Sequence, residues 1–101
     1  MPVDPRIRGK EVDQLFKAVL LLKNVDECYR FFEDICTIKE IKSIAQRLAV
    51  AHMLNEGARY SDTSKITGAS TATISRVKRC LNFGADGYKL VLERMKSKKL
   101  E

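Results

Sequence analysis

The placement of proline most constrains how this 101-residue chain can fold, because proline interrupts helices and central strands. Both prolines, Pro2 and Pro5, lie within the first five residues. Nothing after them forbids a helix. No later segment shows the apolar–polar alternation of a half-buried strand, so the chain is predicted to be all-α. We expect residues 1–8 to form a flexible N-terminal arm.

The spacing of apolar residues predicts six helices. In residues 9–23, GKEVDQLFKAVLLLK, apolar side chains recur at the helical period. A second helix is predicted at 25–36. The third begins at a capping box formed by Thr37 and Glu40, and it ends at Gly57. The remaining helices are predicted at 60–66, 70–82 and 87–98, with Gly68 at the turn between the first two of these.

Composition indicates a soluble globular protein, with 45% hydrophobic and 32% charged residues. No apolar run is long enough to span a bilayer, and residues 1–13 lack the apolar core of a signal peptide. We therefore expect a cytoplasmic protein without a membrane role. The three cysteines, Cys28, Cys36 and Cys80, form no CxxC pair, which predicts buried free thiols rather than disulfides or a zinc site. No cofactor or metal is predicted.

Charge is unevenly distributed along the chain. Residues 1–58 hold nine basic and nine acidic residues, whereas residues 59–101 hold ten basic and four acidic ones. The whole net charge of +6 therefore lies in the second part. Such asymmetry favours an anionic partner, for example a nucleic acid.

The segment GASTATISRVKRC, residues 68–80, lies in this basic part and predicts a helix with two different faces. One side gathers the apolar residues, and the opposite side gathers small and basic ones. The first set is Ile74, Val77, Cys80 and Leu81; the second is Thr71, Ala72, Ser75 and Arg79, flanked by Arg76 and Lys78. Small hydroxyl side chains can approach base edges closely, and the basic residues that follow can meet phosphates.

Residues 60–79 thus have the order of a helix-turn-helix: a short helix, a glycine turn and a second helix that could enter a major groove. One feature departs from this pattern. Thr63 and Thr67 occupy positions of the first helix that face inward and are expected to be apolar. An ordinary αα corner is the alternative interpretation.

The chain resembles the Trp repressor family, and its YerC/YecD group in particular. The resemblance spans about residues 12–96 and is most specific in GASTATISR, with further matches at the TxxE cap and Arg47. It implies a six-helix fold intertwined as a homodimer, with dimerisation helices in 9–57, a helix-turn-helix in 60–82 and a C-terminal helix at 86–98, all within one domain at 9–101. The apolar first helices agree with a shared dimer core.

The resemblance also implies a transcription regulator of the repressor type that binds a palindromic operator in duplex DNA. Its DNA-binding residues would lie on both helices of the pair. By position these are Ser61, Ser64, Ser70, Thr71, Ala72, Thr73, Ser75, Arg76, Lys78 and Arg79.

A small-molecule effector pocket is implied at Thr37, Arg47, Arg76 and Val77. Trp repressor has glycine where this chain has Val77, and leucines where it has Asp34 and Cys36. A valine would intrude on an indole ring, and a carboxylate buried against one would be costly. We therefore expect that tryptophan is not the ligand, and the identity of any effector stays open.

Three other functions agree less well with the sequence. RNA binding would use exposed aromatic side chains, but most aromatics fall in the first two predicted helices. A protein-interaction module would leave the polar face of residues 70–82 unexplained. Catalysis has little support, because His52 is the single histidine and no nucleophile–base grouping accompanies it.

Overall fold

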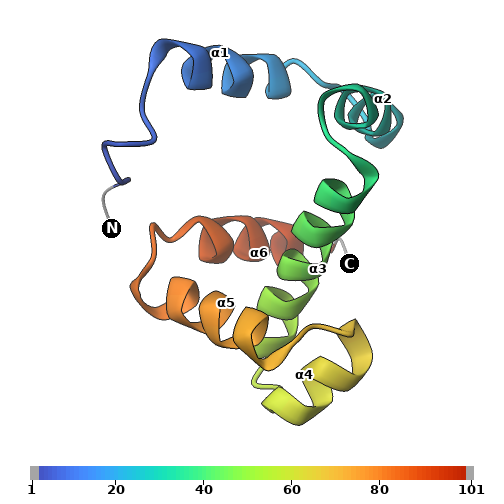
Figure 1. Cartoon of the computed structure of the whole chain (residues 1–101), viewed down its shortest axis with the longest axis vertical. Helices are drawn as coiled ribbons and strands as arrows, with labels where there is room; N and C mark the ends of the chain where they lie inside the picture. The colour runs from blue at the N-terminus through green and yellow to red at the C-terminus, as the bar shows by residue number, and fades with distance from the viewer. Residues whose placement is uncertain (1–2, 100–101) are drawn as a thin grey trace. The chain divides into compact units, whose positions relative to one another are not determined.

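The computed structural model describes residues 3–99, and this part of the chain forms six helices and no strand (Figure 1). The helices are α1 (Lys10–Val19), α2 (Val25–Ile35), α3 (Ile38–Asn55), α4 (Tyr60–Thr67), α5 (Thr71–Phe83) and α6 (Gly87–Ser97). The predicted all-α class is confirmed. The predicted boundaries at 1–8 and 9–101 include residues 1, 2, 100 and 101, which lie outside the described residues, and these boundaries stay a prediction.

The described chain divides into two compact units, residues 3–42 and 43–99, with the boundary inside α3. In the first unit, neither α1 nor α2 contains a buried residue. Helix α1 ends four residues before the predicted end at 23. The amides of Leu21 and Leu22 donate to carbonyls only three residues back, at 3.1 Å each. This is the tighter 3₁₀ pattern, and the α-helical hydrogen bonding ends there.

Helix α3 begins and ends at the predicted signals. The Thr37 amide donates to Glu40 Oε1 at 2.8 Å, and the Glu40 amide donates to Thr37 Oγ1 at 3.1 Å. This reciprocal pair is the predicted capping box, and it lowers the pKa of the Glu40 carboxyl. At the other end Gly57 has φ +88°, while the Ala58 amide bonds the Met53 carbonyl. These are the features of a Schellman C-cap.

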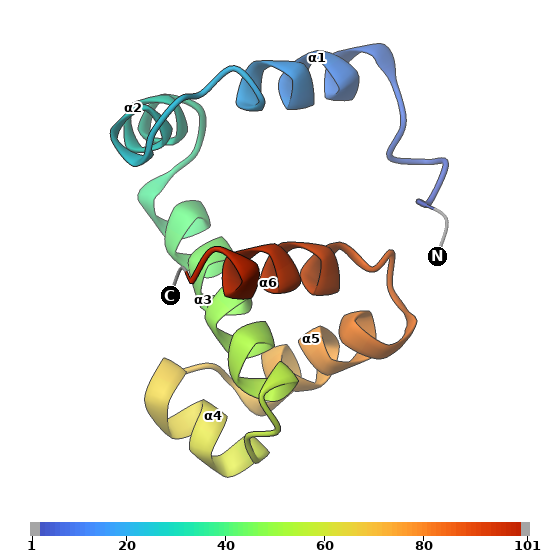
Figure 2. The same ribbon diagram turned by 180° about the vertical axis from the view of Figure 1, so that it is seen from behind.

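The core of the second unit is formed where α3, α5 and α6 meet. Its buried apolar residues are Val50, Ala51, Leu54, Ala69, Ile74, Val77, Leu81 and Leu92. Helix α5 contacts both α4 and α6, and the two views in Figures 1 and 2 show α6 running beside α5. This core seats α5 by one face and leaves its opposite face uncovered.

The cysteines are free, as predicted, but they are not buried. Cys28 and Cys36 are half-buried and Cys80 is exposed. Cys80 was predicted on the apolar face of its helix. It lies about 60° beyond Val77 around the helix axis, at the edge of the stripe, and Ile74, Val77 and Leu81 suffice to cover the core.

Candidate nucleic-acid interface

Helices α4 and α5 are joined by a tight turn of three residues, 68–70. Gly68 has φ +75°, a left-handed conformation that favours glycine, and its amide donates to the Ser64 carbonyl at 2.8 Å. Ser70 then caps α5, because its hydroxyl oxygen accepts a hydrogen bond from the Thr73 amide at 3.1 Å. The predicted glycine turn and serine cap are both present.

The polar residues on the inner side of α4 form hydrogen bonds with backbone groups nearby. The Thr63 hydroxyl donates to the Arg59 carbonyl at 2.9 Å, and the Thr67 hydroxyl donates to the Thr63 carbonyl at 2.6 Å. The Ala69 amide in turn donates to Thr67 Oγ1 at 3.2 Å. Each inward hydroxyl is thus satisfied by nearby backbone, so the polar side chains do not contradict a packed helix pair.

The predicted contact face of α5 is open to solvent. The exposed residues are Thr71, Ala72, Ser75, Arg76 and Arg79, while Thr73 and Lys78 are half-buried. On the opposite face Ile74, Val77 and Leu81 are buried. Small polar groups therefore stand at the N-terminal end of this face and cations follow them, as the sequence pattern predicted.

The serines predicted to make contacts from the helix pair are placed differently from one another. Ser61 is exposed near the start of α4. Ser64 is half-buried, and its hydroxyl proton is donated to the Ala69 carbonyl at 2.9 Å. A phosphate would compete with that carbonyl for the same proton. Ser70 is exposed, but its oxygen is engaged as the helix cap.

The residues of the implied effector pocket are found in different surroundings. Thr37 caps α3 in the first unit. Arg47 is half-buried and donates to the Ser43 hydroxyl at 3.3 Å, Arg76 is exposed, and Val77 is 2% exposed within the core. Val77 therefore occupies the apolar interior rather than the wall of an open space.

Tyr88 on α6 was missed by sequence reasoning. Its phenol is under the influence of the positive charges of Arg47 and Arg76. Burial raises the pKa of its phenol, and Cys80 raises it further, whereas the positive charges of Arg47 and Arg76 lower it. Both guanidinium groups thus lie within electrostatic range of one phenol. No periodicity signal identifies this grouping, because its members come from three helices.

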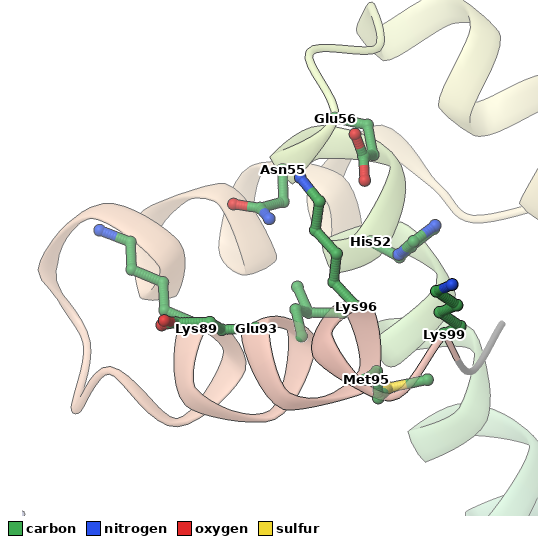
Figure 3. Close-up of a pocket in the computed structure, with 9 residues that line it drawn as sticks. His52, Asn55, Glu56, Lys89, Glu93, Met95, Lys96 and Lys99 are labelled. Carbon is green, nitrogen blue, oxygen red and sulfur yellow. The ribbon is translucent and has the colours of Figure 1, made fainter.

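A separate pocket of about 660 Å³ lies between the end of α3 and α6 (Figure 3). Its lining includes the buried Leu92 and the half-buried Met95. Around it stand His52, Asn55, Glu56, Lys89, Glu93, Lys96 and Lys99. None of these residues belongs to the predicted DNA or effector sites.

Within residues 3–99 no group of acidic, histidine or cysteine side chains is arranged to hold a metal ion. The same residues include no helix that is both long and apolar enough to cross a membrane.

An eight-residue helix, a glycine turn and a thirteen-residue helix seated on an all-α core define a helix-turn-helix protein. Comparison with known proteins gives the family. The chain belongs to the Trp repressor family, because the sequence model of that family, described as Trp repressor protein, matches residues 10–96. This is a family of regulators, and together with the fold it indicates a helix-turn-helix DNA-binding regulator.

The relatives agree in sequence and in structure. The chain is 59% identical over 101 residues to the uncharacterized protein YerC of Bacillus subtilis strain 168, covering 100% of this chain and 96% of that protein. A crystal structure of a TrpR like protein from Eubacterium eligens ATCC 27750 is 54% identical, with a TM-score of 0.89 and coverage of 97% and 99% of the two chains.

A crystal structure of a candidate Trp repressor from Staphylococcus aureus is 52% identical, with a TM-score of 0.87 and coverage of 90% and 91%. The predicted six-helix fold and the resemblance to the YerC group are therefore confirmed.

Proposed function

We propose that this protein is a homodimeric transcription regulator that binds a palindromic operator in duplex DNA and acts as a repressor. The observation that carries the proposal is the two-sided character of α5. Ile74, Val77 and Leu81 seat the helix, while Thr71, Ala72 and Ser75 face solvent at its N-terminal end. A helix held this way can present its small side chains to base edges in a major groove.

Electrostatics supports the same role. Arg76 and Arg79 are exposed on α5 behind the small residues, in the part of the chain that holds the whole net charge of +6. These cations would meet phosphates on either side of the groove and contribute the affinity that does not depend on sequence. Ser61, exposed at the start of α4, would add a contact to the backbone. The proposed location of the protein is the cytoplasm, together with the DNA that it binds.

A second copy of the chain is the proposed partner of the first unit. Large apolar side chains there are uncovered: Phe16 is 54% exposed, Leu20 84% and Tyr29 71%. Soluble proteins rarely leave such surfaces open, and an intertwined dimer would cover them. Two copies related by a twofold axis would also present two α5 helices to a palindromic site.

Any small-molecule effector of this protein is proposed to be a compound other than tryptophan. Val77 fills the position that in Trp repressor is a glycine beside the bound indole, and its side chain lies in the core. Because the chain contains no tryptophan, the fluorescence of added tryptophan would report binding directly. An unchanged signal on titration with protein is the expected result, and a saturable change would contradict this part.

The test of the function is selection of random duplex DNA by the purified protein at physiological salt, followed by sequencing. Enrichment of a palindrome whose half-sites lie about one helical turn apart is expected for a dimeric reader. Weak binding that disappears as salt rises, without enrichment, would reduce the basic face to non-specific attraction. Preferential selection of single-stranded RNA in a parallel experiment would favour the alternative RNA-binding role instead.

A further inference from the structure

Gln46 links α3 to the helix-turn-helix by a hydrogen bond between distant parts of the sequence. It is a half-buried residue of α3, and its side-chain Nε2 donates a hydrogen bond to the Thr67 carbonyl at 3.1 Å. The two residues are 21 positions apart in the sequence. The side-chain hydrogen bonds inside the turn, by contrast, join residues two to five apart.

The Thr67 carbonyl is a group that helix geometry leaves without a partner. Thr67 is the last residue of α4, and the final four carbonyls of a helix have no amide to accept from within it. The Gln46 amide supplies that donor from outside the helix. The same Nε2 lies 4.0 Å from the place where a Cβ of Gly68 would stand, so only a side chain added there would reach it.

This hydrogen bond lies next to the start of α5, the helix proposed to contact base edges. Thr67 is followed by Gly68, by the buried Ala69 and by Ser70, which caps α5. A change in the position of the Thr67 carbonyl therefore moves the first turn of α5, where Thr71 and Ala72 are exposed. Base readout needs hydrogen-bond geometry at individual base edges, whereas attraction to phosphates tolerates small displacements.

We propose that Gln46 is a positioning residue for base recognition: its amide ties the end of α4 to α3 and so sets the angle at which α5 meets DNA. This inference rests on the proposed function. It assigns Gln46 to discrimination between DNA sequences and not to overall affinity for DNA.

The experiment uses Gln46→Met, which keeps the length and the helix preference of the side chain but removes the donor without changing charge. Gln46→Glu is a second variant that places a carboxylate oxygen against the Thr67 carbonyl. Gln14→Glu is the matched control, because Gln14 is an exposed residue of α1 and receives the same change. Affinities for the selected duplex and for a scrambled duplex are measured over a series of salt concentrations.

The expected result for Gln46→Met is a loss of about tenfold in the ratio of specific to non-specific affinity, comparable to one mismatched base pair. The dependence of non-specific binding on salt should stay unchanged, because no phosphate contact is lost. Gln46→Glu should lower the ratio at least as far, while Gln14→Glu should keep it.

Amide hydrogen exchange in the protein alone gives a second measurement that a general loss of stability would not reproduce. The amides of Gly68 and Ala69 should exchange faster in Gln46→Met, while that of the buried Val77 should exchange as in the parent. Faster exchange at all three positions would mean that Gln46 only stabilises the fold, and it would overturn the proposal.

The remaining outcomes separate the two ideas. A parent protein that prefers the selected duplex, together with a Gln46→Met variant that prefers it equally, would overturn the role of Gln46 and leave the proposed function standing. A parent protein with no preference for any duplex would overturn the proposed function and this role with it.

Discussion

The hydroxyl of the fully buried Thr63 donates to the carbonyl of Arg59, the N-cap residue of α4, at 2.9 Å. The same carbonyl also accepts from the Thr63 backbone amide at 3.0 Å. The hydroxyl of this buried threonine thus has a local hydrogen-bond partner and needs no polar partner across the core. This relationship explains how a helix with polar inner residues packs in the helix pair.

Replacing Thr63 separates the contribution of its shape from that of its hydroxyl. In Thr63→Val the shape is kept and the Arg59 carbonyl retains its backbone donor, so the free energy of unfolding should fall by less than about 1 kcal/mol. Thr63→Ala leaves a space in the core and should cost about 1–2 kcal/mol. Urea unfolding at fixed protein concentration gives both values. Equal losses in the two variants would show that the hydrogen bond matters more than packing.

Gly84 is required where the chain leaves α5. A Cβ built on it would overlap the backbone carbonyl of Cys80, which cannot rotate away as a side chain can. Gly84→Ala should therefore destabilise the protein by about 1–3 kcal/mol. Gly87, the first residue of α6, has nothing within 4 Å of its Cβ position, so Gly87→Ala should be neutral or stabilise by up to about 1 kcal/mol. Thermal unfolding compares the pair, and similar melting temperatures would refute the steric explanation.

Local signals in the sequence were enough to predict the ends of most helices. Thr37 with Glu40, Gly57, Gly68 and Ser70 each act on backbone groups within a few residues, so the pattern itself contains the interaction. The same holds for the buried side of α5, because helical period alone places Ile74, Val77 and Leu81 together.

Contacts between helices could not be predicted in this way. The bond from Gln46 to Thr67 depends on where α4 lies against α3, and periodicity shows which face is apolar without showing its neighbour. Cys80 was assigned to the core because it borders the apolar stripe, yet it is exposed. The grouping of Tyr88 with Arg47 and Arg76 likewise depends on the meeting of three helices.

The phenol of Tyr88 should titrate above 10.0, its ordinary pKa, because burial disfavours the phenolate. A pKa raised in the folded state means that the stabilising effect is complete below pH 10.0 and is lost as pH rises through the folded pKa. The ultraviolet absorbance of phenolate in the parent, minus that of Tyr88→Phe, isolates this group. Arg76→Gln should raise the pKa further, since it removes a positive charge that lowers it. An unchanged pKa in that variant would place Arg76 out of electrostatic range of the phenol.

Thr71, the first residue of α5, should act on sequence preference more than on affinity. Thr71→Ala should reduce discrimination at one base position by about tenfold, the usual scale of a single mismatch. Ser61→Ala, at a predicted backbone contact, should instead weaken binding about equally on all duplexes. Binding to a series of duplexes with single base changes measures both effects. A uniform loss for Thr71→Ala would refute its base-reading role.

Arg79 provides a test of phosphate contact and of the dimer together, because it is exposed on α5 behind the small residues. Each lost phosphate contact flattens the dependence of log affinity on log salt by about one unit. In a homodimer that presents two α5 helices, Arg79→Ala should therefore flatten the slope by about two units on every sequence. Arg30→Ala, an exposed cation on α2, is the matched control and should keep the parent slope. An unchanged slope for Arg79→Ala would remove this residue from the interface, whereas a change of about one unit would mean that a single copy contacts DNA.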